Sequence, residues 1–144
     1  ALMTHIGNIV LLTIRPEIGE KIREIVGIKG LSDTSLFEEI SLGMSHSTLS
    51  SAILRKWNFN EALVQAVEYH HRPHVAPEKY RELTYCVYLS SAFLDIEERK
   101  TRYELLDEEV LTFFRLGERE NFNKLMARVK KQYQEQTSGS RPQQ

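Results

Sequence analysis

Apolar residues recur at helical spacing along nearly the whole chain, and this periodicity limits the fold more than any other feature of the sequence. No stretch alternates between apolar and polar residues with a period of two and then ends in a hairpin turn, so a β-sheet has little support. A chain of 144 residues has the size of one ordinary domain with a single hydrophobic core. We therefore expect an all-α fold, built as a compact bundle of several helices.

The helical pattern is divided by proline, glycine and capping residues. Pro16 ends a first helix, because the residue before a proline is pushed out of the α region. Ser45 and Asn60 carry side-chain oxygens of the kind that cap helix N-termini. The segment 83–96 is apolar on all sides, so it is expected at the domain centre, with Cys86 as a buried structural thiol. The expected helices cover residues 2–13, 16–26, 36–42, 45–57, 60–71, 83–96, 107–114 and 122–129.

The two ends of the chain differ in what they predict. Residues 1–3 already lie inside an apolar helical pattern with no N-cap before them, so the first helices of the domain are expected to be absent. Residues 137–144 have no apolar side chain to bury and are expected to form a disordered tail. The predicted domain therefore covers residues 1–136. Within it, Trp57 follows Ile53 at helical spacing and is expected in the core.

Charge and cysteine content exclude several classes of partner and site. The 19 basic residues balance 20 acidic ones, which leaves no overall positive field for a nucleic acid. The single cysteine, Cys86, excludes an internal disulfide and a thiolate zinc cluster, and it fits a reducing cytoplasm. The apolar run 9–14 is far too short to span a bilayer. Neither a nucleic acid nor a membrane is therefore expected as a partner.

The histidines are the side chains best suited to bind a ligand or a metal ion, and four of the five lie in three short segments. Each segment lies near the boundary of an expected helix, where side chains from different helices can converge. The segments are Thr4-His5-Ile6-Gly7, Gly43-Met44-Ser45-His46 and His70-His71-Arg72-Pro73.

These segments resemble the HDOD family, a regulatory branch of the HD superfamily of helical metal-dependent phosphohydrolases. Residues 2–11 are similar to the family's Leu-Leu-His-Asp-Ile-Gly-Lys segment, and residues 66–73 to its Ala-Ile followed by His-His-x-Pro. Residues 39–57 are similar to its Glu, Gly, Asp-His, Leu, Trp pattern. The resemblance covers residues 1 to about 100 and corresponds to the C-terminal two thirds of the family domain.

The resemblance also implies that the metal ligands of the HD superfamily are incomplete in this chain. The first histidine would lie before Ala1, Thr4 and His5 stand in place of the His-Asp pair, and a late aspartate falls near Ser90-Ser91. Two-metal phosphohydrolysis needs carboxylates that bridge the cations and lower the pKa of the attacking water. No metal and no other cofactor is therefore expected.

If a ligand pocket survives, the resemblance places His5, His46, His70, His71 and Arg72 around it. Ordinary structural roles are the alternatives: a first-turn His46 would bond to nearby polar groups, and Arg72 would bond to helix-terminal carbonyls. Because His70 and His71 are adjacent on an expected helix, they should point about 100 degrees apart and not hold one ion together.

The expected function is that of a non-catalytic, HDOD-like regulatory module in a bacterial signal-transduction protein. Such a module would bind a signalling protein or domain, or a small-molecule or nucleotide signal. The first alternative is a metal-dependent HD-type phosphohydrolase acting on a nucleotide or cyclic dinucleotide, with Glu38 or Glu39 completing the ligands. The second is a structural domain that forms a homodimer through apolar surface left uncovered by the missing helices.

Overall fold

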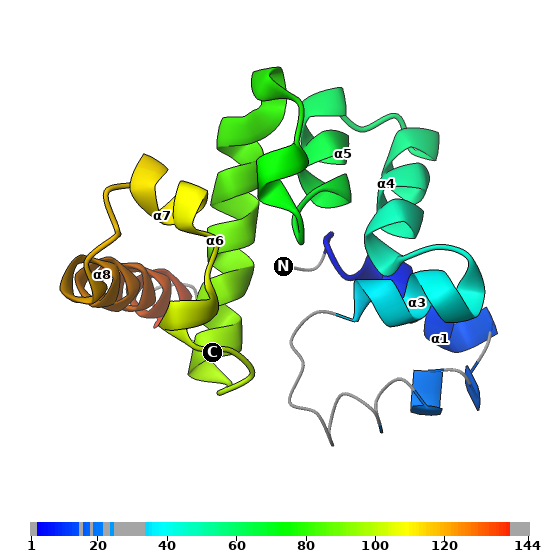
Figure 1. Cartoon of the computed structure of the whole chain (residues 1–144), viewed down its shortest axis with the longest axis horizontal. Helices are drawn as coiled ribbons and strands as arrows, with labels where there is room; N and C mark the ends of the chain where they lie inside the picture. The colour runs from blue at the N-terminus through cyan, green and yellow to red at the C-terminus, as the bar shows by residue number, and fades with distance from the viewer. Residues whose placement is uncertain (1–2, 15, 18, 22–23, 25–33, 139–144) are drawn as a thin grey trace, which may run out of the picture. The chain divides into compact units, whose positions relative to one another are not determined.

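The computed structural model describes residues 3–14, 16–17, 19–21, 24 and 34–138. Every regular element among these residues is a helix, which confirms the all-α prediction (Figure 1). The chain divides into two compact units, Ala1–Asp107 and Glu108–Gln144. The division into a domain of residues 1–136 and a tail stays a prediction.

In the first unit, helix α4 (His46–Lys56) contacts the helices that carry the other histidine segments. It packs against α1 (Ile6–Ile14) and against α5 (Glu61–Glu68), and it also contacts α3 (Ser35–Leu42). The long helix α6 (Arg81–Glu97) packs against α5 (Figure 1). The 3-10 helices of this unit are η1 (Pro73–Val75), η2 (Glu78–Tyr80) and η3 (Tyr103–Leu105).

The helix boundaries follow from local capping chemistry. The Ser45 side chain accepts a hydrogen bond from the Thr48 backbone N–H, and Asn60 accepts one from Ala62, so both expected N-caps are confirmed. Helix α3 ends at Gly43, which has a φ of 77° and donates its N–H to the Glu39 carbonyl. A residue without a Cβ adopts this left-handed conformation at no steric cost.

The buried core of the first unit lies between α4 and α5 and extends to α6. Leu54, Val64 and Val67 form a buried cluster, against which Leu63 packs. Helix α6 contributes the buried side chains of Tyr85, Leu89 and Ala92.

Two expectations about the core are wrong. Cys86, on α6, is exposed, because α6 buries one face only and leaves Leu83 and Leu94 largely open. Trp57 is 57% exposed, because α4 ends at Lys56 and the helical spacing from Ile53 no longer places the indole on the buried face.

Helices α1 and α4 approach each other closely at Gly7. A Cβ at this position would lie 2.1 Å from the His46 carbonyl oxygen, so a glycine is needed for steric reasons. The Gly7 N–H donates to the Ser50 hydroxyl at 2.8 Å, and this hydroxyl donates to the Thr4 carbonyl at 3.2 Å. The start of α1 is therefore fixed against the first turns of α4.

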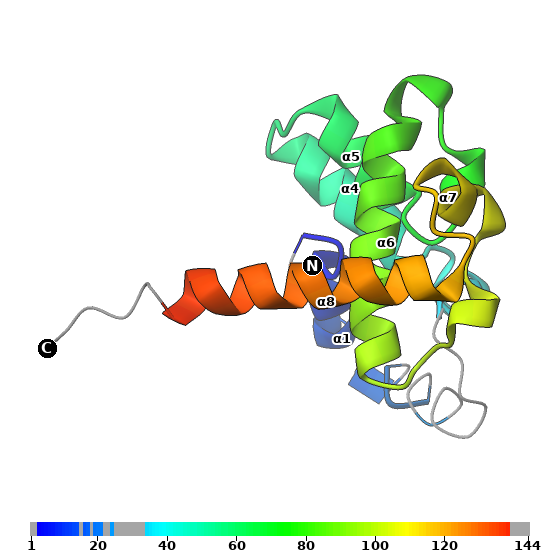
Figure 2. The same ribbon diagram turned by 90° about the vertical axis from the view of Figure 1, so that its left-hand side faces the viewer.

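The second unit contains α7 (Glu108–Phe113) and the long helix α8 (Arg119–Ser138), which Figure 2 shows along its length. Helix α8 includes Thr137 and Ser138 from the expected tail, and residues 139–144 lie outside the described residues. Of the helix expected over residues 16–26, the described residues 16–17, 19–21 and 24 are helical, and the others lie outside the described part. No helix among the described residues is both long enough and apolar enough to cross a bilayer.

Candidate functional site

Four histidines from three segments of the chain converge in the first unit. His5 lies directly before α1, His46 is the first residue of α4, and His70 and His71 follow the end of α5. The ring centroid of His46 lies 6.0 Å from that of His5, 5.5 Å from that of His70 and 4.9 Å from that of His71. The rings of His70 and His71 are 4.0 Å apart. We call these four residues the histidine cluster.

Part of the cluster is enclosed by protein. His46 and His70 are only 2% and 1% exposed, whereas His71 is partly buried and His5 lies at the surface. Partial desolvation of the His5 ring, followed by the nearby ring of His46, lowers the pKa of His5, which favours its neutral form. The His5 Nδ1 accepts a hydrogen bond from the Asn8 side-chain amide at 3.4 Å. The cluster thus has a buried side and an open side.

Glu38, on α3, fixes the orientation of His46. Its Oε2 accepts two hydrogen bonds from this residue, one from the ring Nδ1 and one from the backbone N–H, both at 2.7 Å. Its Oε1 accepts a third from the Thr34 hydroxyl at 2.6 Å. Burial works to raise the pKa of Glu38, but these hydrogen bonds outweigh it and leave the pKa below the ordinary value. A charged carboxylate only accepts, so the Nδ1 of His46 donates to it, and the Nε2 of the ring faces the cluster.

The backbone fixes the ring of His70 in the same way. Its Nδ1 donates to the Val67 carbonyl at 2.6 Å, so Nε2 carries a lone pair. This Nε2 is buried and has no hydrogen-bond partner among the described residues. Burial, followed by the neighbouring His71, lowers the pKa of His70 to about 2. The ring is therefore neutral at physiological pH and presents an unpaired acceptor.

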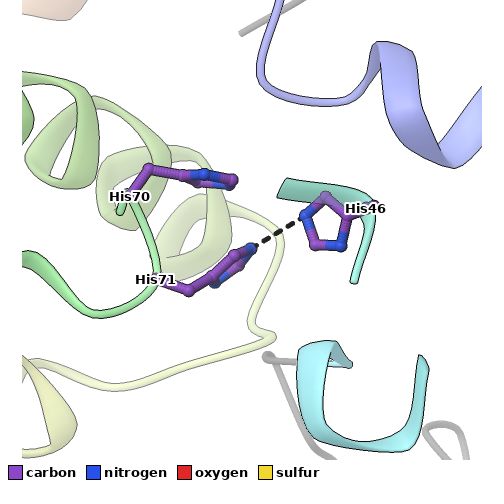
Figure 3. A group of neighbouring side chains, drawn as sticks. All are labelled: His46, His70 and His71. Carbon is purple, nitrogen blue, oxygen red and sulfur yellow. Dashed lines mark hydrogen bonds between the residues drawn. The ribbon is translucent and has the colours of Figure 1, made fainter. Parts of the chain in front are cut away.

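The Nε2 atoms of His71 and His46 lie 3.0 Å apart. Figure 3 marks this hydrogen bond with a dashed line. This contact joins the histidine at the start of α4 to the turn that follows α5. One ring nitrogen from each of His46, His70 and His71 lies within 4.8 Å of the other two, so the three residues could hold a metal ion.

The convergence of His70 and His71 corrects the expectation that they point apart. Helix α5 ends at Glu68, and both histidines lie in the turn that follows, where the angular spacing of a helix no longer applies. Arg72 is oriented differently: its side chain is 60% exposed, and its guanidinium donates to the Glu39 carboxylate at 3.1 Å. Four of the five expected site residues therefore meet in the cluster, and a ligand-binding role for any of the five stays a prediction.

A small cavity of about 160 Å³ adjoins His70 and His71. Among the residues that line it is Asp95 on α6, which the sequence reasoning did not consider. Burial raises the pKa of Asp95, an effect that Lys100 opposes and Glu98 reinforces. The family resemblance places an aspartate near Ser90-Ser91, and Asp95 lies one helical turn after Ser91 on the same face of the helix. The sequence therefore contains a signal for Asp95, one turn beyond the expected position. The other lining residues are Tyr88, Ser91, Ala92, Thr101, Leu105 and Leu106.

The possible metal ligands are ring nitrogens, which suit a single ion better than two ions joined by bridging carboxylates. Two-metal hydrolysis requires carboxylates that bridge hard cations. Glu38 is the carboxylate hydrogen-bonded within the cluster, and both its oxygens are occupied by His46 and Thr34. The group of possible ligands among the described residues consists of three imidazoles. Glu38 therefore orients a histidine and does not itself offer a bridging oxygen.

Comparisons with known proteins agree with the family resemblance in part. The model of the HDOD domain matches residues 1–73. The expected extent is therefore corrected: the match lies in the N-terminal half of the chain and does not reach residue 100. It does include all five expected site residues, His5, His46, His70, His71 and Arg72.

An uncharacterized protein of Treponema pallidum (strain Nichols) is 26% identical to the chain over 115 residues, which cover 80% of this chain and 22% of that protein. The chain thus spans about a fifth of the length of this relative. No solved structure matches the chain.

Proposed function

The chain belongs to the HDOD domain family, and on this premise we propose that it is a non-catalytic regulatory module of a bacterial signal-transduction protein. Its histidine cluster would bind a small-molecule or nucleotide signal or a group presented by a partner protein. The bacterial relative extends well beyond the aligned region, which is the arrangement expected of a module within a larger signalling protein.

One combination of features carries this proposal. The cluster offers a buried polar atom that a ligand could bind, but its hydrogen-bonded carboxylate is not free to take part in hydrolysis. Buried polar groups normally have hydrogen-bond partners, so the unpartnered Nε2 of His70 marks a place where a ligand would be favoured. Hydrolysis would also need an anionic group next to the reacting centre. Glu38, the carboxylate bonded to the cluster, is already bound by His46 and Thr34.

A metal-dependent phosphohydrolase is the second candidate, and one observation favours it. Asp95 lines the same cavity as His70 and His71, so a second carboxylate besides Glu38 adjoins the cluster. A nucleotide phosphate bound in the cavity would then have both imidazole and carboxylate groups around it.

A ligand panel separates the two candidates. The purified chain is mixed with nucleotides and cyclic dinucleotides, with and without added manganese, and both the unfolding midpoint and the products are measured. The regulatory proposal expects a ligand to raise the midpoint without being turned over, and expects His71→Ala to abolish the shift. If the chain instead forms product in large excess over its own concentration, and His71→Ala forms none, the protein is a phosphohydrolase.

A further inference from the structure

The cavity of about 160 Å³ beside the histidine cluster is rich in oxygen atoms that accept hydrogen bonds. Its lining includes the carboxylate-bearing Asp95 and the hydroxyl-bearing Tyr88, Ser91 and Thr101. No lysine or arginine is among the described residues that line it. An anion in this cavity would therefore meet a carboxylate without a permanent positive charge beside it, whereas a cation would be attracted.

The Asp95 carboxylate has no hydrogen-bond or ion-pair partner among the described residues. Lys100 is the neighbouring base, but its ammonium group pairs with Glu98. Partial burial raises the pKa of Asp95, an effect that Lys100 opposes, and this direction is expected of a carboxylate that lacks a counter-charge. A bound cation would supply that counter-charge.

We propose that this cavity binds a small organic cation of the guanidinium class, with Asp95 as its counter-ion. The inference deepens the proposed function, on which it rests, by naming the chemical class of the signal. A guanidinium group is planar and presents N–H donors in a fork that matches the two oxygens of a carboxylate. The hydroxyl oxygens of the lining would accept hydrogen bonds from its remaining N–H groups.

The ring of His70, which also lines the cavity, is a second and independent observation. Its Nδ1 donates to the Val67 carbonyl, and its buried Nε2 has no hydrogen-bond partner among the described residues. Burial, followed by the neighbouring His71, lowers the pKa of His70 to about 2, so the ring carries no positive charge that would repel a cation. An unpaired acceptor favours a ligand with N–H donors, whereas a phosphate or carboxylate ion brings only acceptors.

The size of the cavity limits the ligand to a small molecule. A cavity of about 150 Å³ in another protein holds one benzene molecule, so a volume of about 160 Å³ leaves room for a guanidinium group with a short alkyl substituent. Ala92, Leu105 and Leu106 add apolar surface that such a substituent can contact.

The test uses the whole purified chain and methylguanidinium chloride, at concentrations well below those that unfold proteins. Binding is followed by the backbone amide NMR signals of the chain, and we expect saturable shifts centred on α6. N-methylurea has the same shape without the charge, so it should bind roughly tenfold more weakly or worse. Methyl phosphate, as an anion, should cause no saturable shift at α6.

Three variants of α6 separate charge from space. Asp95→Asn keeps the shape of the side chain and removes its charge, so it should weaken methylguanidinium binding roughly tenfold or more. Ser91→Leu leaves the charge unchanged and fills the cavity, so it should weaken binding as well. Glu82→Gln is the matched control, because Glu82 is exposed on the same helix and does not line the cavity. It should bind as the unchanged chain does, and unfolding midpoints show that each variant folds.

The outcomes distinguish the cation site from the broader function. The cation site is wrong if methylguanidinium does not bind, or if N-methylurea or methyl phosphate binds as tightly. It is also wrong if Asp95→Asn or Ser91→Leu binds methylguanidinium as tightly as the unchanged chain. If one of these failures occurs while a nucleotide raises the unfolding midpoint without turnover, the regulatory function stands without the cation site. If methylguanidinium binds as expected but is converted to product over many turnovers, the cation site stands and the regulatory function is wrong.

Discussion

The Glu38 carboxylate accepts hydrogen bonds from both the ring Nδ1 and the backbone N–H of His46, each at 2.7 Å. One oxygen therefore holds the start of α4 and orients the imidazole at the same time. The two residues are eight positions apart, on either side of the turn at Gly43. Because both side chains are buried, the pair is shielded from solvent and contributes more than a surface pair would.

Glu38→Gln should destabilise the chain by about 1.5–3 kcal/mol, because a hydrogen bond to a charged group is replaced by a neutral one at a buried site. The free energy of unfolding, measured by urea titration, tests this expectation. Glu39→Gln is the matched control, since the next residue pairs with Arg72 at the surface and should change the stability by less than about 1 kcal/mol. Equal effects of the two variants would contradict the role given to Glu38.

Gly7→Ala should destabilise the chain by about 2–3 kcal/mol, because the new Cβ would lie 2.1 Å from the His46 carbonyl oxygen and force α1 away from α4. A urea titration again gives the change. At Gly117 a Cβ meets nothing within 4 Å, so Gly117→Ala should leave the stability within about 0.5 kcal/mol of the original value. A Gly7→Ala variant as stable as the original would show that the two helices can separate at little cost.

The sequence was sufficient to predict the helical class and several of the helix boundaries. Ser45 and Asn60 cap α4 and α5 as expected, because capping depends on one side chain and the next two or three backbone amides. The placement of Trp57 and Cys86 was wrong, because burial depends on which face of a helix meets its neighbours. Helical periodicity alone does not contain that information.

The candidate site was predictable in its residue types but not in its geometry. The histidine segments were identified from the sequence, yet the meeting of His70 and His71 depends on α5 ending two residues before His70. The bond between Glu38 and His46 is formed across a turn, and sequence spacing gives no direct sign of it. Asp95 reaches the cavity only because α6 packs against α5.

Ser50→Ala should cost about 1–3 kcal/mol, because it leaves the Gly7 N–H and the Thr4 carbonyl without the hydroxyl that now bonds both. Urea titration measures the loss. Ser90→Ala removes an exposed hydroxyl that donates to the Cys86 carbonyl of its own helix, and it should change the stability by less than about 0.5 kcal/mol. If the two serine variants lose the same stability, the hydroxyl of Ser50 does not fasten α1 to α4.

Asp95→Asn should raise the unfolding midpoint by a few degrees at neutral pH, because burial disfavours the charged carboxylate. The folded-state pKa of Asp95 is raised above its ordinary value of 3.8, so the unfavourable effect is complete above the raised pKa and vanishes below 3.8. The gain from asparagine should therefore shrink between about pH 7 and about pH 4 in thermal unfolding experiments. Glu78→Gln, at an exposed position of η2, should give no gain at either pH. A gain from Asp95→Asn that stays constant with pH would mean that packing, and not charge burial, causes it.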